Sequence, residues 1–153
     1  MMKKVLITFI LLLITLNGFA NTINNIVVVD AYARETAKGQ DVGAVYISLK
    51  NKGNKTVKFI GASTPIANTA QIHSMKMNNN ISSMKHEQFL EVPANGELKL
   101  LPGESHIMLM GLKSPLIKGQ TFPLNLHFEG LQDLKIEVPI KSINVDEMKD
   151  MKM

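Results

Sequence analysis

Hydrophobic and polar residues alternate along most of this chain. Residues 44–49, 122–128 and 134–140 place an aliphatic or aromatic side chain at every second position, which is the pattern of a β-strand with one buried face. Shorter stretches rich in Val, Ile and Leu extend the pattern, and no segment shows a convincing helical period. The expected strands lie at residues 26–33, 44–49, 57–60, 71–77, 81–85, 98–100, 106–110, 122–128 and 134–140.

Turn-forming residues separate these stretches at short intervals. Runs that contain Asn, Gly or Pro occur at 51–54, 78–80, 93–96 and 102–103. Asn and Gly tolerate left-handed backbone angles and Pro fixes φ, so these runs favour tight turns. Many short strands joined in this way predict an all-β protein, an antiparallel β-sandwich. Because Pro139 cannot donate a backbone hydrogen bond, we place the last strand at a sheet edge.

The first residues have the features of an export signal. A lysine pair precedes an apolar run at 5–16, and small residues at positions 18 and 20 suit cleavage after Ala20. The run is shorter than the roughly 20 apolar residues that span a bilayer, so we expect no membrane anchor after cleavage. The expected organisation is a cleaved signal peptide at 1–20, a single exported domain at 21–141 and a flexible, Met-containing tail at 142–153.

Composition argues against several classes of protein. The chain has 17 Lys and Arg and 13 Asp and Glu. Without the two Lys of the signal, 15 basic residues face 13 acidic ones, a net charge of +2. No basic stripe alternates with aromatic residues, which argues against nucleic acid as a partner. With no Cys, we expect neither a disulfide framework nor a lipid attached to a lipobox cysteine.

The sequence also lacks the motifs of common enzymes. There is no Cys nucleophile, no Ser-centred nucleophile elbow and no His-Glu-x-x-His metalloprotease motif. Acidic residues are scattered and show no paired-carboxylate pattern; they include Asp30, Glu35, Glu87 and Glu104. We therefore expect a protein that is not an enzyme.

Two short segments carry a distinctive set of side chains. Residues 73–77 and 106–110 both have the pattern His-x-Met-x-Met, in a chain with only four His. In a strand, residues two apart share a face, so each segment directs one imidazole and two thioethers to the same side. Neutral imidazole and soft thioether ligands, with no thiolate, favour the soft monovalent ion Cu(I). Ile107 and Leu109 alternate with the second row and are expected to point into the core.

Other interpretations of these residues exist. Met is a common filler of irregular cores, and an interaction or adhesion sandwich would need no metal at all. Zinc sites recruit Cys, His or carboxylate in preference to Met. A blue-copper electron carrier needs a Cys thiolate with two His, and this chain has no Cys.

The spacing of the candidate ligands resembles a known family. Ten residues separate His73 from Met84, twenty-one separate Met84 from His106, and Met108 follows at the second position. This resembles the His-x10-Met-x21-His-x-Met signature of periplasmic copper chaperones of the PCuAC type. The likeness extends from about Val27 to Ile140. It implies a cupredoxin-like Greek-key sandwich and one Cu(I) bound by these four side chains.

Further side chains are secondary candidates. Met75, Met77 and Met110 share a strand face with a proposed ligand, and the alternative for each is core packing. His86 lies two residues after Met84 and is expected on the same face, outside the four-ligand motif. His127 is expected at the surface. The tail adds thioethers without His, which argues against Cu(II) binding there because Cu(II) prefers nitrogen and oxygen; these are Met148, Met151 and Met153.

The resemblance implies a periplasmic carrier that delivers Cu(I) to cytochrome c oxidase, in particular to the CuA site of its subunit II, alongside a Sco-type thiol protein. The residues themselves do not identify that receiver. Copper storage or resistance is an alternative role for the same site. We expect a monomer, with a metal-bridged dimer as the alternative.

Overall fold

The computed structural model describes residues 22–23 and 25–142, and every regular element in this part of the chain is a β-strand. The predicted signal peptide at 1–20 lies outside the described residues, as does the predicted tail beyond Ser142. In chain order the strands are β1 (Thr22–Ile23), β2 (Ile26–Arg34), β3 (Val42–Asn51), β4 (Val57–Ser63), β5 (Ala67–Asn78), β6 (Ile81–His86), β7 (Leu90–Val92), β8 (Glu97–Leu100), β9 (His106–Leu112), β10 (Thr121–Phe128) and β11 (Leu134–Lys141).

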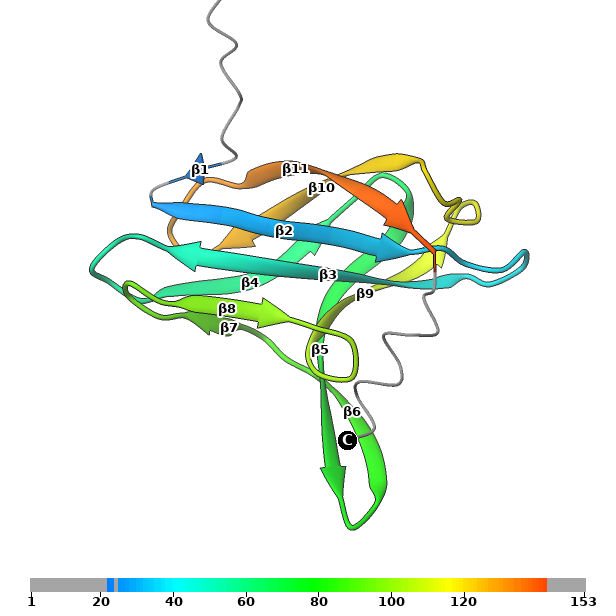
Figure 1. The fold of residues 1–153 in the computed structure, drawn as a ribbon, viewed down its shortest axis with the longest axis horizontal. Helices are drawn as coiled ribbons and strands as arrows, with labels where there is room; N and C mark the ends of the chain where they lie inside the picture. Colours follow the sequence, from blue (N-terminus) through cyan, green and yellow to red (C-terminus); the bar gives the residue numbers. More distant parts are fainter. Residues whose placement is uncertain (1–21, 24, 143–153) are drawn as a thin grey trace, which may run out of the picture.

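Seven of these strands form a closed ring. The order is β2, β11, β10, β4, β5, β9 and β3, and β3 returns to pair with β2. Neighbours in the ring are antiparallel, except that β11 and β2 are parallel where they meet. Strands β1, β6, β7 and β8 pair with single members of the ring (Figure 1). The all-β prediction is confirmed, and the expected antiparallel sandwich is a closed barrel with one parallel contact.

The alternating residues fill the inside of this barrel. Every second side chain of β10 and β11 is buried, as predicted from the period of two. Ile72 of β5 and Ile107 of β9 are 1% and 0% exposed, and they lie opposite each other in the register. Burying side chains of this size contributes roughly 1.5–3 kcal/mol each. Because a slip of one residue would turn every side chain to the other face, this burial fixes the pairing of β5 with β9.

Strand β5 continues beyond the barrel and forms a hairpin with β6. The connection is a two-residue turn at Asn79 and Asn80, with φ of 49° and 63°, the left-handed angles of a type I′ turn. All six residues of β6 are exposed, and the hairpin projects away from the barrel (Figure 1). The strand expected at 81–85 is therefore confirmed.

Two details of the strands were not evident from the sequence. Strand β7 has only three residues, too few to show a period. Strand β11 pairs with β10 from Leu134 to Pro139 and meets β2 at Ile140 and Lys141. The prediction that this strand lies at a sheet edge is therefore wrong, because β11 lies between β10 and β2. Pro139 is tolerated because the described pairing gives it no β2 partner, which suits a residue that has no N–H to donate.

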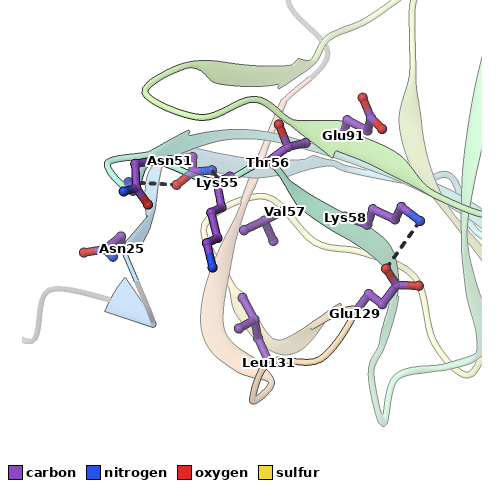
Figure 2. Close-up of a pocket in the computed structure, with 11 residues that line it drawn as sticks. Asn25, Asn51, Lys55, Thr56, Val57, Lys58, Glu91, Glu129 and Leu131 are labelled. Carbon is purple, nitrogen blue, oxygen red and sulfur yellow. Dashed lines mark hydrogen bonds and ion pairs between the residues drawn. The ribbon is translucent and has the colours of Figure 1, made fainter.

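Asn51 is a buried polar residue that joins a turn to a neighbouring strand. Its amide donates to the carbonyl oxygens of Lys55 at 2.7 Å and Val92 at 3.1 Å, and its Oδ1 accepts from the Gly53 N–H at 2.9 Å. The side chain borders an open cavity of about 430 Å³ whose rim also holds the Lys58–Glu129 ion pair (Figure 2). These bonds hold the turn between β3 and β4 against β7.

Replacing Asn51 with Ala should lower the free energy of unfolding by about 2–4 kcal/mol, because three bonds are lost and buried backbone groups lose their partner. Chemical denaturation would measure the change. The exposed Asn54→Ala is the matched control and should change stability by less than about 0.5 kcal/mol. Equal effects of the two substitutions would contradict this role of Asn51.

Gly111 lets β9 approach β5 closely. Its φ is +67°, and a Cβ at this position would clash with the side-chain amide of Asn68. The next residues on either side, Met110 and Leu112, pair with Thr69 and Ala67. A side chain at 111 would therefore push apart the two strands that carry His73 and His106.

Gly111→Ala should destabilise the protein by more than Gly39→Ala, which also has a positive φ (+84°) but no atom within 4 Å of the added Cβ. The control should show the backbone strain alone, about 1–2 kcal/mol, and Gly111→Ala should add a steric cost of about 1–3 kcal/mol. Denaturation midpoints of the two variants provide the comparison. Identical losses would show that the Asn68 contact is unimportant.

Candidate metal centre

His73 lies at the centre of a cluster of imidazole rings. Strand β5 pairs with β9 on one side and with β6 on the other, and His73 is directly opposite His106 and directly opposite His86. Side chains directly opposite in a sheet share a face. The ring centroid of His73 is 6.2 Å from that of His106 and 5.7 Å from that of His86. Imidazole–metal bonds are about 2 Å long, so two rings that bind one ion have centroids about 5–6.5 Å apart.

The thioethers lie at opposite corners of this cluster. Met84 is opposite Met75, one step further out along the hairpin than His86. Met108 is opposite Gln71, one step further in than His106. Both Met84 and Met108 are thus diagonal neighbours of His73, a separation of about 7–8 Å that long side chains span.

The structure therefore brings some of the predicted ligands together and separates others. His73 and His106 are adjacent, as the paired-strand interpretation expected. Met84 and Met108 are opposite Met75 and Gln71, which are four residues apart on β5. At the rise of an extended strand, this separates the two thioether positions by roughly 13 Å along β5. The four residues meet only around His73.

The secondary candidates fall into two groups. Met75 and His86 border His73, whereas Met77 is opposite Ser82 near the tip of the hairpin and 74% exposed. Met110 is opposite Thr69, two positions beyond Met108 and away from His73.

His127 lies elsewhere. Its Nδ1 is 2.8 Å from an oxygen of Asp133, and its Nε2 is 2.9 Å from Oγ of Ser63. These partners explain His127 without a metal.

The position of His86 opposite His73 could have been predicted from the turn between β5 and β6, although the spacing of the four proposed ligands does not include His86. Counting back from the two-residue turn at Asn79 and Asn80 pairs Asn78 with Ile81 and therefore His73 with His86. Two other neighbours had no sequence signal. Gln71 approaches Nε2 of His73, and Tyr46 of β3 has its ring centroid 6.3 Å from that of His106.

The hydrogen bonds of the two rings indicate which nitrogen is available. Nε2 of His73 lies 3.3 Å from Oε1 of Gln71, and Nδ1 of His106 lies 3.4 Å from the carbonyl oxygen of Glu104. Both oxygens accept, so these ring nitrogens donate, and the lone pairs are on Nδ1 of His73 and Nε2 of His106. Nδ1 of His73 is buried and has no hydrogen-bond partner. An unpartnered buried nitrogen is unfavourable, and a bound ion would satisfy it.

Burial keeps these imidazoles neutral. Desolvation lowers the pKa of His73 below its ordinary value, and repulsion from His106 and His86 lowers it further. Burial also lowers the pKa of His106, against a smaller opposing effect of the Glu104 carbonyl. Neutral imidazole is the form that binds metal.

The cluster contains little negative charge. Glu87 accepts a 2.6 Å hydrogen bond from Oγ of Ser74, and Ser74 points to the opposite face of β5. Within residues 22–23 and 25–142, no group of three or more His, Asp or Glu side chains is arranged to hold a metal ion. Any ion held here would depend on thioether sulfur in addition to imidazole.

Of two cavities at opposite ends of β3, one borders the site. One of about 260 Å³ is bordered by His106 and Met108, with Tyr46 beneath the Arg34 guanidinium at 5.3 Å. The cavity of Figure 2 lies at the other end of β3 and has neither His nor Met in its lining. Of these two cavities, only the one beside His106 offers ligands for a soft metal.

Comparison with known proteins gives related sequences. A family model described as "Putative lipoprotein LpqE-like" matches residues 26–140. A putative lipoprotein of Leifsonia xyli subsp. xyli is 35% identical over 109 residues, which is 71% of this chain and 66% of the relative. The chain thus spans slightly less than two thirds of the length of that relative.

Solved structures share the fold. The copper-bound PCuAC domain from PmoF2 superposes with a TM-score of 0.68 at 17% identity, over 79% of this chain and 96% of that domain. The solution structure of Cu(I)-bound DR1885 from Deinococcus radiodurans gives 0.60 at 30% identity, over 81% of each chain. Apo-DR1885 gives 0.62 at 29% identity, over 80% and 82%. The resemblance to PCuAC domains and their cupredoxin-like fold is confirmed.

The described residues contain no helix long and apolar enough to cross a membrane.

In the metal-free folded protein, the pKa of His73 lies below 6.5, the ordinary value for His, because the ring is desolvated and lies near His106 and His86. The folded state then holds fewer protons than the unfolded state, so stability contributed by the neutral ring is present above pH 6.5 and is lost as the pH falls below it. His73→Gln should lose less stability than wild type between pH 7.5 and 5.5, measured by denaturation in a chelator. An equal loss in both proteins would contradict the lowered pKa.

Proposed function

Because this chain belongs to the LpqE-like family of putative lipoproteins, we propose that it is an exported copper chaperone that carries one Cu(I) ion. The proposed ligands are His73, Met84, His106 and Met108. The observation that supports the proposal most directly is the buried Nδ1 of His73, which has no partner and lies in a cluster of imidazoles and thioethers. The related DR1885 has been solved with Cu(I) bound, which is consistent with the proposal.

The chemistry of the ligands suits a carrier. Two neutral nitrogens and thioether sulfur match a soft monovalent ion, and the thioethers disfavour Zn²⁺, which recruits Cys, His or carboxylate in preference to Met. Among the described residues that share this face of β5, β6 and β9, none is a carboxylate, so the bound state is not held by ion pairing. Each thioether bond is weak, and a receiver replaces the ligands one at a time. Only the bonds between copper and its ligands change during transfer; no covalent bond within the protein is made or broken, and copper stays Cu(I) throughout.

The receiver we propose is a copper centre of cytochrome c oxidase, the CuA site of subunit II, with a Sco-type thiol protein as a further partner. This follows from the PCuAC resemblance. The compartment we propose is the periplasm, from the signal-like residues 1–20 and from the lipoprotein descriptions of the family and its relative. Storage or resistance is the second candidate role. It predicts that deletion causes copper sensitivity while oxidase activity stays intact.

Anaerobic titration of the purified chain with Cu(I), against a competing chelator, should reveal one tight equivalent with mixed nitrogen and sulfur ligation by X-ray absorption. His106→Ala/Met108→Ala should weaken binding by at least about a hundredfold, since a ligand of each type is lost. His127→Ala/Met77→Ala is the matched control and should bind as wild type does. No tight site, or equal binding by both double variants, would overturn the ligand assignment.

A further inference from the structure

The hairpin of β5 and β6 contains a second set of ligands of its own. His73 is opposite His86 and Met75 is opposite Met84 in consecutive same-face positions of the ladder. The four side chains therefore form a block of two imidazoles and two thioethers on one face. Met75 and His86 are outside the proposed ligand set, and nothing from β9 is needed to complete the block.

This block, the outer block, is more exposed than the inner block that His73 forms with His106 and Met108 of β9. Met84 and Met75 are 50% and 36% exposed, and all of β6 is exposed. On the inner side, His106 is 6% exposed, and the ring of Tyr46 lies beside it. An ion in the outer block can be reached by another protein, whereas an ion beside His106 is sheltered by the barrel.

His73 belongs to both blocks. It is the one residue directly opposite both other rings, and its two centroid distances of 5.7 and 6.2 Å are similar. The other two rings flank β5 on opposite strands, which are about 9–10 Å apart. Among the described residues, no three His, Asp or Glu side chains are arranged to hold one ion, so a single ion that binds His73 takes one of the two flanking rings at a time.

We propose that copper occupies two positions that share His73 and Met84: a sheltered one completed by His106 and Met108, and an exposed hand-off position on the hairpin completed by Met75 and His86. This rests on the proposed function and extends it. Cu(I) enters and leaves through the hairpin position. It moves between the positions by ligand exchange, in which bonds to His106 and Met108 break as bonds to Met75 and His86 form, with no change of oxidation state.

The first test removes the sheltered position. His106→Ala/Met108→Ala should still bind one Cu(I). Adding Met75→Leu/His86→Gln to this double variant should lower its Cu(I) affinity at least tenfold, so that the quadruple variant no longer competes with the chelator. Circular dichroism and thermal melts confirm folding of each variant. If the double variant binds no Cu(I), or if the two added substitutions leave its affinity unchanged, the hairpin position does not exist.

The second test leaves the sheltered position intact. Met75→Leu/His86→Gln in the otherwise unchanged protein should bind Cu(I) within about threefold of wild type but release it to excess chelator at least tenfold more slowly in stopped flow. Met77→Leu/His127→Gln changes the same residue types away from His73 and should release copper at the wild-type rate. An unchanged release rate in Met75→Leu/His86→Gln would overturn the hand-off role.

These outcomes separate the two proposals. If wild type binds no Cu(I), the proposed function fails and the hairpin position fails with it. If wild type binds one tight Cu(I) that depends on His106 and Met108, but Met75 and His86 affect neither residual binding nor release, only the hairpin position fails.

Discussion

The pairing of β5 with two different neighbours is the constraint on which the site depends. One half of β5 is a wall of the barrel and pairs with β9, and the other half leaves the barrel and pairs with β6. His73 lies where these halves meet. The register on the barrel side is fixed by burial of Ile72 and Ile107, and the register on the hairpin side is fixed by the turn at Asn79 and Asn80. Together they place a ring on each side of His73.

This position also sets the chemistry of the rings. Ile72, which precedes His73 in the chain, is buried in the apolar core, and the hairpin beyond His73 is exposed to solvent. A half-sheltered imidazole is kept neutral by desolvation and by its neighbouring rings, and its Nδ1 has no protein partner. A site between core and solvent can thus hold a soft ion without negative charge and still expose it to a receiver.

Much of this arrangement follows from local features of the sequence. Alternation predicts the strands, and the two-residue Asn turn determines that His73 faces His86. Other parts depend on contacts between distant segments. The closure of β3 onto β2 and the parallel contact of β11 have no local signal. The spacing of His73, Met84, His106 and Met108 suggested one compact set, but the ladder places Met84 and Met108 at opposite corners, because each is offset by two residues from the ring on its own strand.

The central claim is that Cu(I) binds at Nδ1 of His73 and at His106. The most direct test is the ¹⁵N spectrum of the imidazoles before and after anaerobic addition of one equivalent of Cu(I) to the labelled protein. We predict large shifts of Nδ1 of His73 and Nε2 of His106, with His127 unchanged. A His73 ring whose nitrogens do not respond, or a response of His127 as large as that of His73, would contradict it.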